Sequence, residues 1–236
     1  MAAEEINALL RNDTLEELSV SGCSMKLATL GAIVLSCVSR PGRERACIRA
    51  GNLGADLVCN DSILAALATT VGATSNLRLL DLSRNGLSGQ QVIDVVAALA
   101  SADLALEEID LSGNDLLVAA DGSRARSVAA LADWLASPRC GVQVLRLAGD
   151  HPYTLGPDVV RLAEALAAAG VTSLTGLDLS DNRAGPEALV AATAILFGMP
   201  SLVSLWLDGN EVTLDAASEI EAGLIGNARI TYFQVT

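Results

Sequence analysis

The sequence has few of the residues that enzymes use for catalysis. Its single histidine is His151, and no glycine-rich phosphate loop or H-E-x-x-H zinc motif occurs. A Ser-His-Asp device would require His151, yet nothing around it resembles a nucleophile motif. Protein metal sites use clustered cysteine and histidine, which a lone histidine does not supply. The sequence therefore predicts a protein that is not an enzyme and that uses no cofactor or metal.

Targeting and disulfide signals are also scarce. The five cysteines, at positions 23, 37, 47, 59 and 140, contain no C-x-x-C pair, and their odd number favours reduced structural thiols. The N-terminus has no basic segment of the kind that opens a signal peptide. No uncharged run reaches the roughly 18 residues of a membrane span. We expect an intracellular, cytoplasmic protein and leave cytoskeletal association open.

Basic and aromatic side chains are in short supply. The 236 residues carry a net charge of −13, and an acidic chain repels nucleic acid and anionic membranes, so both are excluded as expected partners. Aromatic residues make up 3% of the chain, whereas apolar residues make up 51%. The core must therefore consist of leucine, valine, isoleucine and alanine.

The pattern that dominates the chain is L-x-x-L-x-L-x-x-N-x-L. It begins at Leu77 and recurs, complete or shortened, at Leu106, Leu174 and Leu202. The alternating leucines predict a short strand with one buried face. The Asn position, filled by Asn85 in the first of these copies, marks the turn that leaves the strand. One unit cannot bury its leucines alone, so the recurrence indicates a stacked array.

Weaker copies extend the array to about seven units. Two lie before residue 77, and a third, over 142–150, has Asp150 at the Asn position. Between the strands the apolar spacing changes to a period near 3.6, which predicts helices that begin at Ser88 and at the Gly-Pro pairs 156–157 and 185–186. Residues 1–14 are predicted as an N-terminal cap, and 228–236 as a C-terminal cap with a closing strand at 230–232.

Repeat units of 28 to 29 residues, each with a full helix, resemble the ribonuclease-inhibitor-like class of leucine-rich repeats. That class includes ribonuclease inhibitor, the Ran GTPase activator and tropomodulin, and the resemblance covers about residues 13–236. It implies one α/β domain over 1–236, a right-handed leucine-rich repeat solenoid or horseshoe with parallel strands on the concave face and helices on the convex face. It also implies that the asparagine side chains bond neighbouring backbone groups as a ladder. The motif is specific for fold and nearly silent on function.

Candidate binding residues lie on the concave face and its rim. Strand residues outside the buried column point onto that face. Trp206 occupies a position on that face where other copies of the motif have an aspartate. Exposed tryptophan is enriched at interaction hot spots. Two longer loops, 117–124 and 151–155, should emerge on one rim, where binding residues concentrate. The candidate partner-binding residues are Trp206, Asp208, Asp178, Arg146, Asp110, Asp81, Arg45, Arg49, His151 and Tyr153.

A plainer interpretation remains open for each of these features. The aspartates can be ordinary residues of the repeat motif without a binding role, and the loops can be neutral insertions. Trp206 can be covered by the C-terminal cap. The leading hypothesis is a non-catalytic protein–protein interaction module, an adaptor or subunit of an intracellular assembly that binds protein partners through the concave face and rim loops. The alternatives are a GTPase activator resembling the Ran activator, with Arg84 on the rim but no acidic extension after the repeats, and a structural spacer without a specific partner.

Overall fold

The computed structural model describes residues 17–19, 21–22, 46–52, 77–101, 105–116 and 125–235. Within these ranges eight parallel strands form one sheet, and their order in the sheet is their order in the sequence. The strands are β1 (Glu17–Ser19), β2 (Ala46–Arg49), β3 (Leu77–Asp81), β4 (Glu108–Asp110), β5 (Val144–Arg146), β6 (Gly176–Asp178), β7 (Ser204–Trp206) and β8 (Tyr232–Gln234). Each unit therefore lies beside the next, as the repeat requires.

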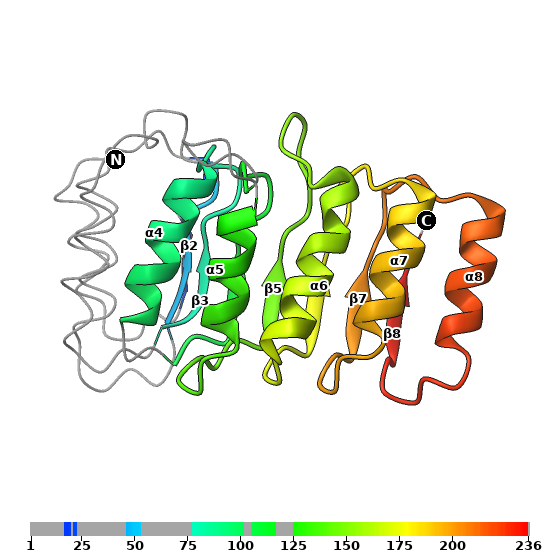
Figure 1. Ribbon diagram of the computed structural model, residues 1–236. Coiled ribbons are helices and arrows are strands. Elements are labelled where there is room, and N and C mark those ends of the chain that lie inside the picture. The colour runs from blue at the N-terminus through cyan, green and yellow to red at the C-terminus, as the bar shows by residue number, and fades with distance from the viewer. Residues whose placement is uncertain are drawn as a thin grey trace, which may run out of the picture.

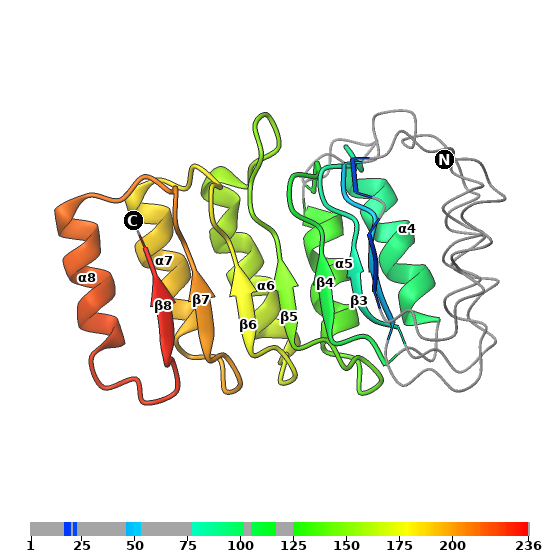
Figure 2. The same cartoon turned by 180° about the vertical axis from the view of Figure 1, so that it is seen from behind.

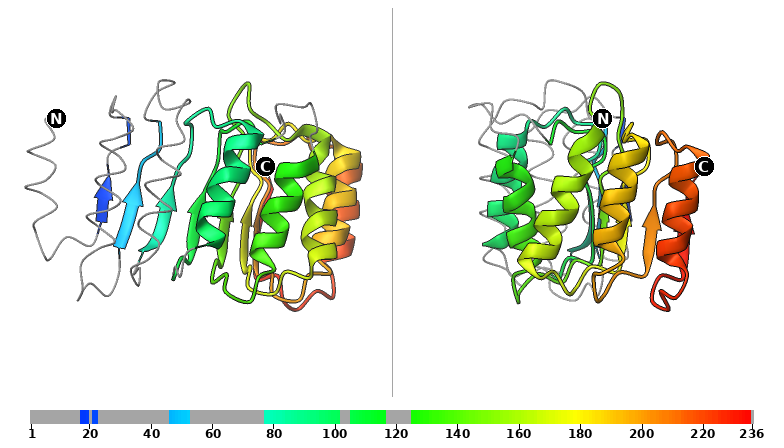
Figure 3. Two further views of the ribbon diagram at one scale, coloured as in Figure 1. Left: turned by 60° about the vertical axis from the view of Figure 1, so that its left-hand side comes forward. Right: turned by 45° about the vertical axis from the view of Figure 1, so that its right-hand side comes forward.

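The helices cover one face of this sheet. They are α4 (Gly89–Ala100), α5 (Ala125–Leu135), α6 (Val159–Ala169), α7 (Pro186–Leu196) and α8 (Leu214–Leu224), with a short 3-10 turn, η2 (Gly156–Asp158), before α6. Figure 1 shows the helices in front of the strands, and Figure 2 shows the opposite side of the sheet, which no described helix covers. The oblique views of Figure 3 show the same two layers. The predicted fold class, a solenoid of strands on one face and helices on the other, is confirmed.

The leucines of the motif build the core that holds the layers together. Leu77 and Leu80 are each 1% exposed, and the α4 residues Val92 and Leu99 are buried against them in the same apolar cluster. Ser88 begins α4 with a capping box, in which its side chain accepts from the Gln91 backbone N–H and the Gln91 side chain accepts from the Ser88 N–H. The tryptophan at 134, on α5, is buried, as its place in an apolar helical stripe predicts.

The asparagines of the motif form a ladder along the turns that follow the strands. The side-chain amide of Asn114 donates to the carbonyls of Leu82 and Leu111, each at 2.9 Å. Its Oδ1 accepts from the backbone N–H groups of Asn85 and Leu87, at 3.1 and 3.0 Å. Each such side chain therefore joins its own unit to the unit before it, as the resemblance implies.

One predicted detail is wrong in register, and one position of the motif departs from the ladder. The closing strand is Tyr232–Gln234 rather than 230–232, because Phe233 pairs with Leu205 and packs, partly buried, against the core. Asp150 stands at an Asn position in the sequence but takes no part in the ladder. Its side chain instead forms an ion pair with Arg84 Nε at 3.0 Å.

Some predictions concern residues outside the described ranges, namely the N-terminal cap, Arg45, the loop 117–124 and the cysteines at 23, 37 and 59. The two described cysteines, Cys47 and Cys140, are only partly exposed. Burial raises the pKa of the Cys140 thiol. None of the helices in the described ranges has the length and apolarity needed to cross a bilayer.

Candidate functional site

Most of the predicted site residues lie in one line across the open face of the sheet. The strand register places one residue of each strand from β2 to β8 side by side. We call these residues the central row: Arg49, Asp81, Asp110, Arg146, Asp178, Trp206 and Gln234. Asp208 follows Trp206 by two positions, just beyond the end of β7. The repeat thus gathers side chains from units far apart in the sequence onto one surface.

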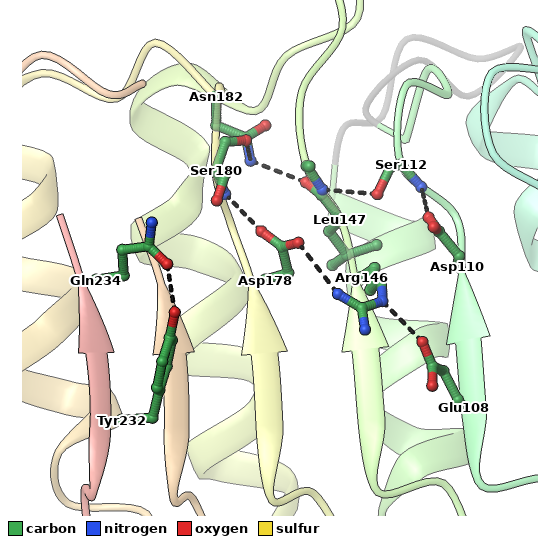
Figure 4. Close-up of polar contacts among 11 residues, drawn as sticks. Glu108, Asp110, Ser112, Arg146, Leu147, Asp178, Ser180, Asn182, Tyr232 and Gln234 are labelled. Atoms are coloured by element: carbon green, nitrogen blue, oxygen red, sulfur yellow. Dashed lines mark hydrogen bonds and ion pairs between the residues drawn. The ribbon is translucent and has the colours of Figure 1, made fainter. Parts of the chain in front are cut away.

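Arg146 is the cation at the centre of this row. Its Nε lies 2.7 Å from Glu108 Oε1, and its Nη1 lies 3.7 Å from Asp178 Oδ2. Figure 4 shows the guanidinium held between these two carboxylates. Burial alone would lower the pKa of Arg146, but the hydrogen bond and charge of Glu108 and the nearby aspartates raise it above its ordinary value. The guanidinium is therefore a fixed, fully charged group.

Arg146 also lies over the indole ring of Trp206, with Cζ 5.7 Å from the ring centroid. On β8, the ring of Tyr232 has its centroid 5.4 Å from that of Trp206, at an interplanar angle of 46°. The Tyr232 hydroxyl donates to Gln234 Oε1 (Figure 4). We call Arg146, Trp206 and Tyr232 the aromatic cluster. The C-terminal cap thus contacts Trp206, but Trp206 stays partly exposed and Tyr232 is 45% exposed.

Gly176 makes room for this arrangement. A Cβ at this position would lie 3.3 Å from Trp206 Cζ3 and 3.4 Å from Val144 Cγ2, which is tighter than most such contacts. The indole therefore rests against the bare backbone of β6. A Cβ at residue 176 would require the indole ring or Val144 to shift by a few tenths of an ångström.

The aspartates of the row have a local structural task as well. Asp81, Asp110 and Asp178 each accept, through Oδ1, the backbone N–H of the serine two residues later, at 2.9 to 3.0 Å. Asp81 and Asp110 are paired neighbours in the register. Burial raises the pKa of Asp110, with a smaller contribution from Asp81, although its hydrogen bonds with Ser112 act in the opposite direction. These carboxylates brace the strand ends and concentrate negative charge on the face.

Arg49 belongs to a separate ion pair at the other end of the row. Its Nε lies 2.6 Å from Glu17 Oε1, and the side chains are 43% and 52% exposed. An exposed pair of this kind contributes at most about 1 kcal/mol. Its hydrogen bond and charge interaction with Glu17 outweigh burial and raise the pKa of Arg49. The structure does not bring Arg49 to the aromatic cluster.

The rim residues His151 and Tyr153 lie in a loop beside the open face. The Asp150 N–H donates to the Tyr153 carbonyl at 2.8 Å, which closes the loop into a tight turn. Tyr153 lines a pocket of about 440 Å³, whereas His151 is exposed and is not part of its wall. We call this the rim pocket. It is lined by residues 113–116, 147–148, 152–158 and 182.

Among the described residues, no group of three or more His, Cys, Asp or Glu side chains could hold a metal ion. Arg84, the rim residue with suitable chemistry for a GTPase activator, is paired with Asp150.

Sequence reasoning missed three residues of the site. Glu108 lies on the face by the repeat count but has no feature of its own that marks it as the partner of Arg146. Tyr232 was placed in a closing strand two residues too early. The signal for Gly176 was available, because it is the glycine among the outward strand residues of its register row, between Val144 and Ser204.

Comparisons with known proteins agree with the repeat geometry. The model of the family described as Leucine Rich Repeat matches residues 76–95. A search of curated proteins found no match. Among solved structures, an internalin from Listeria monocytogenes aligns with 99% of this chain and 89% of that chain, at 14% identity and a TM-score of 0.25, values too low to carry an argument. The family match over residues 76–95 and the repeated strand, asparagine turn and helix show that the chain has a leucine-rich repeat fold.

Proposed function

We propose that this protein is a non-catalytic protein–protein interaction module that binds a protein partner through the central row of its open sheet face. The observation that carries the proposal is the aromatic cluster. Trp206, Tyr232 and Arg146 are of the residue types that dominate binding energy at protein interfaces. Here they touch one another on a surface that no described helix covers.

The cluster is already ordered before any partner arrives. Arg146 is fixed by Glu108 and Asp178, and the indole rests against Gly176. Side chains that are immobile in the free protein lose little conformational entropy on binding. This preorganisation supports an anchoring role for the cluster rather than that of a passive, solvated surface.

Charge indicates the kind of partner. The face carries Asp81, Asp110 and Asp178 in the row, and the whole chain has a net charge of −13. A partner with basic groups would be attracted to this face and would compensate the charge of these carboxylates. The same charge argues against nucleic acid and anionic membranes as partners. The protein would then act as an adaptor or subunit within an intracellular assembly.

The test begins with capture of binding proteins from extract of the source cells, followed by purification of the partner and measurement of its Kd. Trp206→Ala and Arg146→Ala should each weaken binding about 30-fold or more, since anchor residues typically contribute at least about 2 kcal/mol. Arg161→Ala is the matched control, because Arg161 is an exposed arginine on the helix side, bonded to Asp158. Equal affinity of all variants would reject the open face as the binding surface.

A further inference from the structure

From Asn85 to Asn210, where the structure describes the turns, the asparagine ladder has one gap, and this gap leaves hydrogen-bonding groups without their usual side-chain partner. Where the ladder is continuous, a strand-end carbonyl receives two side-chain amides. Leu82 O accepts from Asn85 and Asn114, at 3.0 and 2.9 Å. Leu179 O accepts from Asn182 and Asn210, at 3.0 and 2.9 Å. Each asparagine thus donates to its own unit and to the unit before it.

At the fifth unit this asparagine is missing, and two carbonyls lose a donor. Among the side chains that the structure describes, Leu111 O receives only Asn114 Nδ2, at 2.9 Å. Within the same residues, Leu147 O receives only Asn182 Nδ2, at 2.8 Å. One acceptor lone pair on each carbonyl is left without a side-chain donor.

The same gap leaves N–H groups without their usual acceptor. In the preceding unit, the N–H groups of Asn85 and Leu87 both donate to Asn114 Oδ1. In the fourth unit, the backbone N–H groups at the same motif positions are those of Asn114 and Leu116. The Leu116 N–H turns back to the Asn114 carbonyl at 3.0 Å, and the Asn114 N–H has no acceptor in the described structure.

The cause of the gap lies in the turn before Asp150. In the other described turns, the residue before the asparagine is left-handed, with φ of 54° at Arg84, 64° at Gly113, 57° at Asp181 and 66° at Gly209. Gly149 does not have a positive φ. The chain therefore leaves the strand on a different path, and the Asp150 carboxylate points to Arg84 instead of into the ladder.

The rim pocket lies at this gap. Asn114, Leu116 and Leu147 line it, and Pro152, Tyr153 and Leu155 add apolar wall. With about 440 Å³, the pocket has room for a side chain together with part of the backbone that presents it. Asn114 and Leu147, which each carry a group that lacks its usual ladder partner, therefore belong to the wall of this pocket.

We propose that the rim pocket binds a primary carboxamide, presented as the glutamine or asparagine side chain of a protein partner, which completes the ladder. A carboxamide oxygen accepts two hydrogen bonds and its NH₂ donates two. This matches the Asn114 N–H, which has no acceptor among the described residues, and the Leu147 carbonyl, and both residues line the pocket. A carboxylate brings no N–H donor and would meet Asp115 and Asp158 in the wall, and an ammonium group brings no acceptor.

This inference does not depend on the aromatic cluster, and its test uses different residues. The probes are three peptides, N-acetyl-Gly-X-Gly-N-methylamide, with X as glutamine, glutamate or methionine. Only the glutamine peptide carries a primary carboxamide, and methionine has a similar length. We expect glutamine to bind about tenfold more tightly than methionine, from two or more additional hydrogen bonds, and to shift the amide NMR signals of Asn114 and Leu116. Equal affinity of the three peptides would overturn the proposal.

Two further measurements keep the test decisive. In the free protein, the Asn114 N–H should exchange with solvent faster than the Asn85 N–H, because only the latter has an acceptor; equal protection would mean that the site is already filled. Tyr153→Ala should weaken the glutamine peptide, whereas Tyr232→Ala, a tyrosine of the aromatic cluster, should not. If the Tyr232 change alone weakened it, the peptide would be bound on the open face, and the rim assignment would be wrong.

Discussion

Replacement of one ladder asparagine tests the argument that these side chains hold adjacent units together. Asn182 is 1% exposed and joins the fifth and sixth units. Asn182→Ala removes the bonds from Nδ2 to Leu147 O and from the Leu155 N–H to Oδ1, at 2.8 and 2.9 Å. Leu179 O keeps a donor because Asn210 still reaches it. Two buried groups therefore lose their side-chain partner.

The cost follows from these two groups. A buried polar group left unsatisfied costs about 1–3 kcal/mol, so we expect Asn182→Ala to lower the free energy of unfolding by about 3 kcal/mol. Urea unfolding followed by circular dichroism measures it. The matched control is Asp150→Ala, at the same motif position but outside the ladder. It removes only an ion pair with Arg84 whose side chains are 62% and 46% exposed, which is worth less than about 1 kcal/mol. Similar losses for the two variants would refute the reasoning.

Two further predictions concern the open face. Because burial raises the pKa of Asp110 in the folded state, its contribution to stability is fully present below the unfolded pKa and is lost as the pH rises through the folded pKa. Asp110→Asn should therefore raise the melting temperature relative to wild type at neutral pH and lose this advantage in acid; a pH-independent difference in calorimetry would contradict the sign. Trp134 is buried and Trp206 is partly covered by Arg146. In a Trp134→Phe background, Arg146→Ala should increase acrylamide quenching of the remaining indole, and unchanged quenching would show that the guanidinium does not shield the ring.

The sequence was sufficient for the fold because the repeat is a packing pattern. The leucine alternation fixes which strand residues are buried, so the outward residues of the central row could be counted in advance. Arg146, Asp178 and Trp206 lie where that count places them. The buried column and the parallel order both follow from a unit that cannot stand alone.

The contacts between outward residues could not be counted in the same way. Trp206 points outward by periodicity, but its partners depend on Gly176 leaving space and on Tyr232 arriving from a closing strand whose register the sequence did not settle. Asp150 is a clearer case. Asp150 lies at the motif position that asparagine fills in the neighbouring units. The backbone φ angle at Gly149 nevertheless decides whether the side chain at 150 enters the ladder, and glycine can adopt either sign of φ.

The absence of an asparagine side chain at the fifth unit divides the array into two mechanical parts. In a solenoid, cooperativity resides in the contacts between neighbouring units. Between the fourth and fifth units that coupling lacks the amide side chain found at the neighbouring seams. It rests on the apolar layer, the strand pairing, the bond from the Ala148 N–H to Ser112 Oγ and the ion pair of Arg146 with Glu108. We expect a stretched molecule to part first at this seam, so the strands from β5 to β8 would behave as one block that outlasts the connection to those before it.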